Sequence, residues 1–178
     1  MDLVGKRIAL LVDNYFEQAE FTGPKQSFLD AGASVTVVSP QSGTVQGLKH
    51  VDKGDTFAVD QSLDDADADS FDALVLPGGA INADHLRMNK KAQEWIRRYI
   101  ERGKIVAAIC HAPWLLVSAD CVRGRHLTSF FTIQDDIRNA GGKWSDEQVV
   151  IDGSLITSRK PDDVPAFADA IKQALAAK

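Results

Sequence analysis

Ile105-Val106-Ala107-Ala108-Ile109-Cys110-His111-Ala112-Pro113 is the stretch of sequence that decides the fold. Its first five residues are all apolar, without alternating polar positions, which is typical of a strand buried on both faces at the centre of a parallel sheet. The pattern breaks sharply at Cys110, and a helical pattern follows over residues 112–119. We therefore predict a central strand that turns abruptly into a helix, with a cysteine at the turn.

Apolar runs of strand length alternate with helical patterns on both sides of this stretch. That alternation predicts an α/β fold with a mainly parallel central sheet. We expect strands at 7–12, 34–38, 73–76, 148–151 and 155–158, and helices at 22–31, 91–101, 133–139 and from Pro161 onward. Residues 40–54 carry Gly43 and Gly47 and no sustained period, so they predict a hairpin at the edge of the fold.

Length and composition describe an ordinary globular protein. The 178 residues fit one domain over 1–178, and the 44% of hydrophobic residues is enough for a packed core. The net charge of -5 argues against direct binding of nucleic acid, whose phosphates are recognised mainly by Lys and Arg. The first apolar run is too short for a signal peptide or a membrane span. We expect a cytoplasmic protein that does not bind a membrane.

Cys110 and Cys121 are the two cysteines in the chain. Two cysteines exclude a disulfide framework and a four-thiolate zinc site, and the scattered histidines show no metal-binding spacing. We expect no metal and no cofactor.

Cys110 stands at the predicted junction between strand and helix. A thiol at a helix N-terminus lies close to free backbone N–H groups, which favour the thiolate and lower its pKa. In an open α/β sheet, this position also lies at the carboxyl ends of the strands, where ligands bind. A lone cysteine is often a small core residue instead, but the adjacent His111 favours a reactive thiol.

Pro77-Gly78-Gly79 follows the predicted strand over 73–76. Glycine has no Cβ, so its backbone N–H groups can come close to a neighbouring thiol. The N–H groups of Gly79 and His111 could then stabilise an oxyanion formed when Cys110 attacks a carbonyl. Taken alone, the same glycine pair could also be a plain turn.

Four motifs in the chain resemble the DJ-1/PfpI superfamily, specifically its intracellular protease I branch (PfpI-like, peptidase C56). They are Phe16-Glu17 with Glu20, Leu76-Pro77-Gly78-Gly79, Ala108-Ile109-Cys110-His111-Ala112-Pro113, and Thr157-Ser158-Arg159-Lys160-Pro161-Asp162-Asp163. The resemblance spans nearly the whole chain. It implies a flavodoxin-like three-layer sandwich with a nucleophile elbow.

The resemblance also implies roles for individual residues. Cys110 matches the nucleophile, and Gly79 and His111 match the oxyanion donors. Glu17 matches the buried acid beside the thiol, protonated and hydrogen-bonded to the sulfur. Asp84 stands where the protease branch has a glutamate that pairs with the histidine of a neighbouring subunit, which implies a homodimer or a higher homo-oligomer.

Two departures weaken the parallel with proteolysis. Asp84 is one methylene shorter than the glutamate of the protease branch, and Phe130 replaces a tyrosine near the thiol. The related amidotransferases use a distant His-x-Glu, which is absent from this sequence. We therefore expect a cysteine-dependent hydrolase acting on small or glycated carbonyl substrates, a glyoxalase or deglycase of the stress response. One alternative is an intracellular peptidase of the PfpI type. A second alternative is a redox-sensing stress protein or chaperone without turnover.

Overall fold

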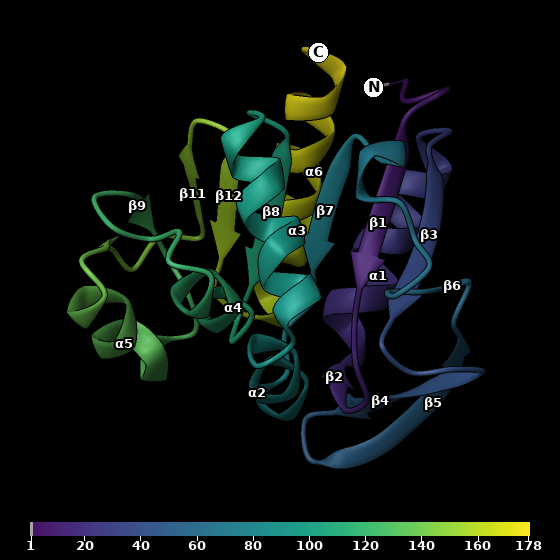
Figure 1. The fold of residues 1–178 in the computed structure, drawn as a ribbon, viewed down its shortest axis with the longest axis horizontal. Helices are drawn as coiled ribbons and strands as arrows, with labels where there is room; N and C mark the ends of the chain where they lie inside the picture. Colours follow the sequence, from purple (N-terminus) through teal and green to yellow (C-terminus); the bar gives the residue numbers. More distant parts are fainter. Residues whose placement is uncertain (1) are drawn as a thin grey trace.

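A computed structural model describes residues 2–178 and contains a seven-stranded sheet (Figure 1). The strands follow in the order β11 (Val149–Asp152), β12 (Leu155–Ser158), β8 (Ile105–Ile109), β7 (Ala73–Leu76), β1 (Arg7–Leu11), β3 (Ser34–Ser39) and β6 (Gln61–Ser62). All neighbouring strands are parallel except β11 and β12, which form an antiparallel hairpin. The predicted α/β fold with a mainly parallel sheet is confirmed.

Helices cover both faces of this sheet and give it three layers (Figure 1). One face carries α1 (Gln18–Asp30) and α6 (Val164–Ala176); the other carries α2 (Ala80–Arg87), α3 (Lys90–Glu101), α4 (Pro113–Ser118) and α5 (Gln134–Asn139). The side chains of β8 alternate between the two cores: Val106 and Ala108 pack on the side of α3, and Ile105, Ala107 and Ile109 on the side of α6. Strand β8 is therefore buried on both faces, as its apolar run predicts.

Short elements complete the described part of the chain. Strand β2 (Phe16–Glu17) pairs with β4 (Thr44–Lys49), which forms an antiparallel hairpin with β5 (Asp52–Ala58). The hairpin predicted over 40–54 is present, but its second strand extends to Ala58. The remaining elements are β9 (His126–Leu127), β10 (Lys143–Trp144) and the 3-10 helices η1 (Ala68–Ser70), η2 (Phe131–Ile133) and η3 (Pro161–Asp163).

The first helix differs from its predicted bounds. It begins at Gln18, about one turn before the expected start at residue 22, and Pro24 lies inside it. Proline lacks an N–H group, so the helix loses the bond that residue 24 would donate to the carbonyl of Glu20. Because the helix starts early, Glu20 lies in its first turn with a fully buried side chain. Helix α2 was not among the predicted helices.

No helix within residues 2–178 has the length and apolar character that crossing a membrane requires.

Candidate active site

Cys110 occupies a sharp turn between β8 and α4. Its backbone has a φ of 63°, in the left-handed region that non-glycine residues seldom adopt. Two hydrogen bonds hold the turn: the Cys110 N–H donates to the Ser158 carbonyl at 3.1 Å, and the Cys110 carbonyl accepts from Phe130 N–H at 2.8 Å. A strained conformation held by neighbouring strands at a reactive residue is typical of a nucleophile elbow.

Backbone donors converge on the Cys110 sulfur. The N–H groups of Gly79 and His111 both hydrogen-bond to it, and both lower the pKa of the thiol. Gly79 has a φ of 95°, and a Cβ at that position would lie 2.6 Å from the backbone nitrogen of Glu17. Residue 79 must therefore be glycine for its N–H group to approach the sulfur so closely. The structure brings together the two oxyanion donors named from the sequence.

The acid nearest the sulfur is Glu20. Its carboxyl is fully buried, and it hydrogen-bonds to the Cys110 side chain. Its Oε2 accepts the N–H of Gly78 at 3.0 Å, whereas its buried Oε1 has no hydrogen-bond partner within residues 2–178. Burial and the nearby charge of Glu17 raise the pKa of Glu20 to about 8. The carboxyl is therefore protonated at neutral pH and can donate a proton to the sulfur or to a bound substrate.

The role implied for Glu17 is corrected by this geometry. Glu17 precedes the first turn of α1, and its Oε2 accepts the N–H of His50 at 3.1 Å. It lies in the wall of the same pocket, yet the buried position beside the thiol belongs to Glu20, three residues further along the chain. The sequence motif contained both acids, but the expected start of the helix left both in a loop. The early start of α1 explains why Glu20 points inward.

The expected lowering of the thiol pKa is also corrected. Burial raises the pKa of the Cys110 thiol, an ionised Glu20 raises it further, and the N–H groups of Gly79 and His111 oppose both effects. The backbone donors follow from the sequence pattern, whereas the burial of the sulfur does not. Because Glu20 is protonated at neutral pH, its contribution as an anion is largely absent there. The thiol and the carboxyl titrate as a coupled pair.

His111 is the second group that could exchange a proton with the thiol. Its Nδ1 lies 3.2 Å from the Cys110 sulfur, and burial lowers the pKa of the imidazole, so the ring is neutral at pH 7. The ring stacks on Phe130, with centroids 4.9 Å apart, and meets the edge of Trp114. On its other side, Nε2 lies 3.4 Å from the Thr132 hydroxyl, a contact that no motif in the sequence predicts.

Asp84 lies on the exposed face of α2. Within residues 2–178 it forms no ion pair with His111, whose polar neighbours are Cys110 and Thr132. Phe130 takes the place expected for it, beside the thiol and against the His111 ring.

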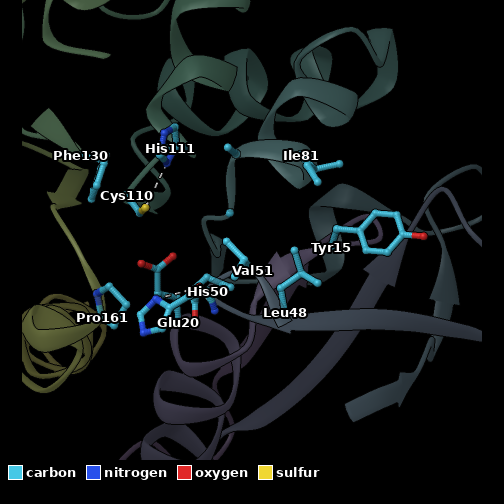
Figure 2. Close-up of a pocket in the computed structure, with 13 residues that line it drawn as sticks. Tyr15, Glu20, Leu48, His50, Val51, Ile81, Cys110, His111, Phe130 and Pro161 are labelled. Carbon is cyan, nitrogen blue, oxygen red and sulfur yellow. Dashed lines mark hydrogen bonds and ion pairs between the residues drawn. The ribbon is translucent and has the colours of Figure 1, made fainter. Parts of the chain in front are cut away.

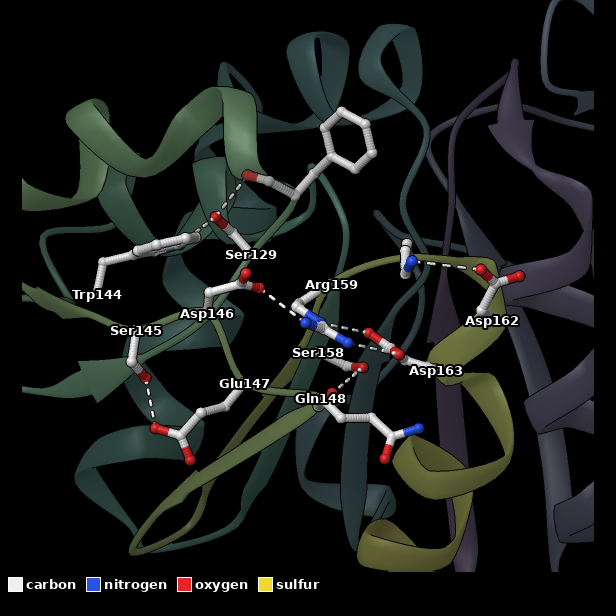
Figure 3. Close-up of polar contacts among 12 residues, drawn as sticks. Ser129, Trp144, Ser145, Asp146, Glu147, Gln148, Ser158, Arg159, Asp162 and Asp163 are labelled. Atoms are coloured by element: carbon white, nitrogen blue, oxygen red, sulfur yellow. Dashed lines mark hydrogen bonds and ion pairs between the residues drawn. The ribbon is translucent and has the colours of Figure 1, made fainter.

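A pocket of about 540 Å³ opens above the sulfur (Figure 2). Cys110, His111 and Glu20 line it, and apolar side chains form much of the remaining wall. Thirteen residues line it: Tyr15, Glu17, Glu20, Leu48, His50, Val51, Gly79, Ala80, Ile81, Cys110, His111, Phe130 and Pro161. The pocket can hold a small organic molecule with a carbonyl group next to the thiol.

Two known proteins are similar to this chain over most of its sequence. Protein/nucleic acid deglycase 2 of Escherichia coli is 44% identical over 167 residues, which cover 92% of this chain and 94% of that protein. The putative cysteine protease YraA of Bacillus subtilis is 37% identical over 164 residues, covering 92% of this chain and 95% of that protein.

A solved structure and a family model agree with these relatives. The crystal structure of Drosophila melanogaster DJ-1beta has a TM-score of 0.88 and 30% identity, with 100% of this chain and 92% of that chain covered. The model of the DJ-1/PfpI family matches residues 6–174. With its cysteine elbow and a match over nearly its whole length, the chain belongs to the DJ-1/PfpI family.

Proposed function

We propose that this protein is a cysteine-dependent hydrolase that acts on carbonyl compounds, as a deglycase or glyoxalase in protection against stress. The observation that carries the proposal is the arrangement around one sulfur atom: a thiol at a strained elbow, two backbone N–H donors and a protonated buried carboxyl. The likeness to the deglycase of E. coli supports the same reaction class.

The geometry supports a first step in which named groups accept and donate each proton. Neutral His111 accepts the thiol proton at Nδ1, which lies 3.2 Å from the sulfur. The sulfur then forms a bond to the carbonyl carbon, and the negative charge moves to the carbonyl oxygen, near the N–H groups of Gly79 and His111. Glu20 can neutralise this oxygen with its proton. For methylglyoxal the overall reaction adds one water and yields lactate.

The test is the loss of methylglyoxal in the presence of the purified protein. The wild type should consume the substrate at a rate that Cys110→Ser abolishes, whereas Cys121→Ser, which changes the other cysteine, should retain that rate. Equal rates for the wild type and Cys110→Ser would refute an enzyme that works through this thiol. A parallel assay with glycated amino acids should show release of the free amino acid.

A peptidase of the PfpI type is the second candidate, and the relative named as a putative cysteine protease favours it. Within one described chain, the contact to Nε2 of His111 is the Thr132 hydroxyl at 3.4 Å, so a carboxylate that orients the ring would have to come from another copy. A fluorogenic peptide assayed beside methylglyoxal separates the two reactions. Cleavage of the peptide that depends on Cys110 and exceeds the turnover of methylglyoxal would replace our first proposal.

A redox sensor is the third candidate, because Glu20 could hydrogen-bond to an oxidised sulfur. In that case, mild peroxide should convert Cys110 to the sulfinic acid, and no carbonyl substrate should turn over. Mass spectrometry of the peroxide-treated protein measures the first result, and the methylglyoxal assay measures the second.

We also propose that the protein works in the cytoplasm as a homodimer or a larger homo-oligomer, in which Asp84 of one copy approaches His111 of another. The exposed position of Asp84 on α2 and the open pocket beside His111 support this contact. Light scattering at micromolar concentration should give at least twice the mass of one chain. Asp84→Asn should then reduce turnover without changing the fold, and a monomeric protein would refute the contact.

A further inference from the structure

Asn82 is a buried amide behind the active site that the mechanism above does not use. It lies in the first turn of α2, and its side chain is fully buried. Its Nδ2 donates to the carbonyls of Pro77 and Gly78, both at 3.0 Å, and its Oδ1 accepts the N–H of Asp13 at 2.7 Å. Each polar atom of the side chain therefore has a partner, as a buried amide requires.

The two carbonyls belong to peptide groups whose opposite sides face the reaction centre. In a trans peptide, the C=O and the N–H point in opposite directions. The Pro77 carbonyl shares its peptide with Gly78 N–H, which donates to Glu20 Oε2 at 3.0 Å. The Gly78 carbonyl shares its peptide with Gly79 N–H, which hydrogen-bonds to the Cys110 sulfur.

Fixing both carbonyls therefore fixes both N–H groups. The Gly78 carbonyl has a second donor, the backbone N–H of Glu17 at 3.2 Å, whereas the Pro77 carbonyl has only Asn82 among the described hydrogen bonds. A glycine pair is flexible, since neither residue has a Cβ to restrict its dihedral angles. Without the amide, the peptide groups around Gly78 would lose a constraint at the positions that face the acid and the nucleophile.

We propose that Asn82 is a positioning residue for the active site, because it orients the two peptide groups whose N–H bonds meet Glu20 and the Cys110 sulfur. This role rests on the proposed cysteine-dependent reaction for its effect on turnover. Its effect on the thiol itself does not depend on the identity of the substrate. Two separate readouts can therefore test it.

The first readout is turnover. Asn82→Ala removes both donated hydrogen bonds, and we expect it to lower kcat with methylglyoxal about 10- to 100-fold. This loss of kcat should not exceed the loss caused by removing one oxyanion donor outright. KM should change less than threefold, because no residue that lines the pocket changes. Asn82→Ser keeps one short donor and should fall between the wild type and Asn82→Ala.

Asn89→Ala is the matched control. Asn89 also makes its bonds through a side-chain amide, but it caps α3 by accepting the N–H groups of Lys91 and Ala92, away from the sulfur. Its loss should lower the melting temperature, as loss of a cap does, and leave kcat unchanged. If Asn89→Ala and Asn82→Ala lost the same fraction of kcat, the effect of Asn82 would be one of general stability. That result would overturn the proposal.

The second readout is the rate at which iodoacetamide alkylates Cys110 at a fixed pH, with the Cys110 and Cys121 peptides separated by mass spectrometry. The Gly79 N–H lowers the pKa of the thiol and so favours the thiolate, the form that is alkylated. Its displacement should therefore slow the alkylation of Cys110 in Asn82→Ala and, by a smaller factor, in Asn82→Ser. This readout remains valid if the wild type does not consume methylglyoxal, a result that would contradict the proposed function alone. An unchanged rate of Cys110 alkylation in folded Asn82→Ser would overturn the proposal.

Discussion

Replacing Glu20 by glutamine should stabilise the protein and impair its chemistry at the same time. The pKa of Glu20 is raised from 4.5 to about 8, with burial as the main cause. Above pH 4.5 the unfolded chain releases this proton, whereas the folded chain retains it until about pH 8. The folded state therefore loses stability as the pH rises through this window, by about 1.4 kcal/mol for each pH unit.

The magnitude follows from the width of the window. Between pH 5 and pH 7 the wild type should lose about 3 kcal/mol of unfolding free energy through this one group. Glu20→Gln has nearly the same shape, can still accept the N–H of Gly78, and does not titrate. The free energy of unfolding of the variant relative to the wild type should therefore rise by about 3 kcal/mol over the same range.

Urea unfolding at pH 5, 6, 7 and 8 measures this difference directly. Glu17→Gln provides a second arm, because the charge of Glu17 is the second cause of the raised pKa of Glu20. In that variant the loss of stability should end at a lower pH than in the wild type. A difference between Glu20→Gln and the wild type that stays constant from pH 5 to pH 8 would refute the assignment of a buried, protonated carboxyl. Turnover by Glu20→Gln should fall by about 10²-fold or more, since the variant has no acidic proton to donate.

Two further substitutions test the packing around and away from the site. Gly78→Ala would place a Cβ 2.2 Å from Glu20 Oε2 and 2.6 Å from the Cys110 Cβ. It should lower the unfolding free energy by about 1–3 kcal/mol and remove most of the turnover. In the control, Gly54→Ala, the new Cβ approaches mainly the movable end of the Gln18 side chain, so this variant should retain turnover. Tyr99→Phe removes the hydroxyl that donates to the Ala68 carbonyl at 2.7 Å, and it should lower the unfolding free energy by about 1–2 kcal/mol in urea with kcat unchanged. Full turnover in Gly78→Ala, or a loss of kcat in Tyr99→Phe, would contradict the described packing.

The strands that position the site could be predicted from the sequence because they are buried on both faces. The uninterrupted apolar runs of β7 and β8 predict buried strands, and the abrupt end of the β8 run predicts the turn at Cys110. The two backbone N–H groups beside the sulfur could be predicted too, since the glycines after β7 and the residue after the cysteine follow adjacent parallel strands.

The choice between the two acids could not be made from local pattern. The helix predicted over 22–31 starts after both acids, but α1 begins at Gln18 and contains Pro24. That earlier start decides which acid faces the sulfur. Glu20 lies inside the helix, on its buried face, whereas Glu17 precedes the helix. The direction of the shift in the thiol pKa could not be predicted for a related reason. Burial of the sulfur depends on the residues that pack around Cys110, and these come from distant parts of the chain.

The arrangement of strands also separates two kinds of motion. Strand β8 has a neighbour on each side and no exposed residue, so its amide protons should exchange with solvent only when the whole protein opens. The β4–β5 hairpin carries Leu48, His50 and Val51 to the mouth of the pocket, and most of β5 is exposed. Its amides should exchange much faster, through local opening. The mouth of the pocket could then open to admit a substrate while the sulfur, the acid and the backbone donors stay in register.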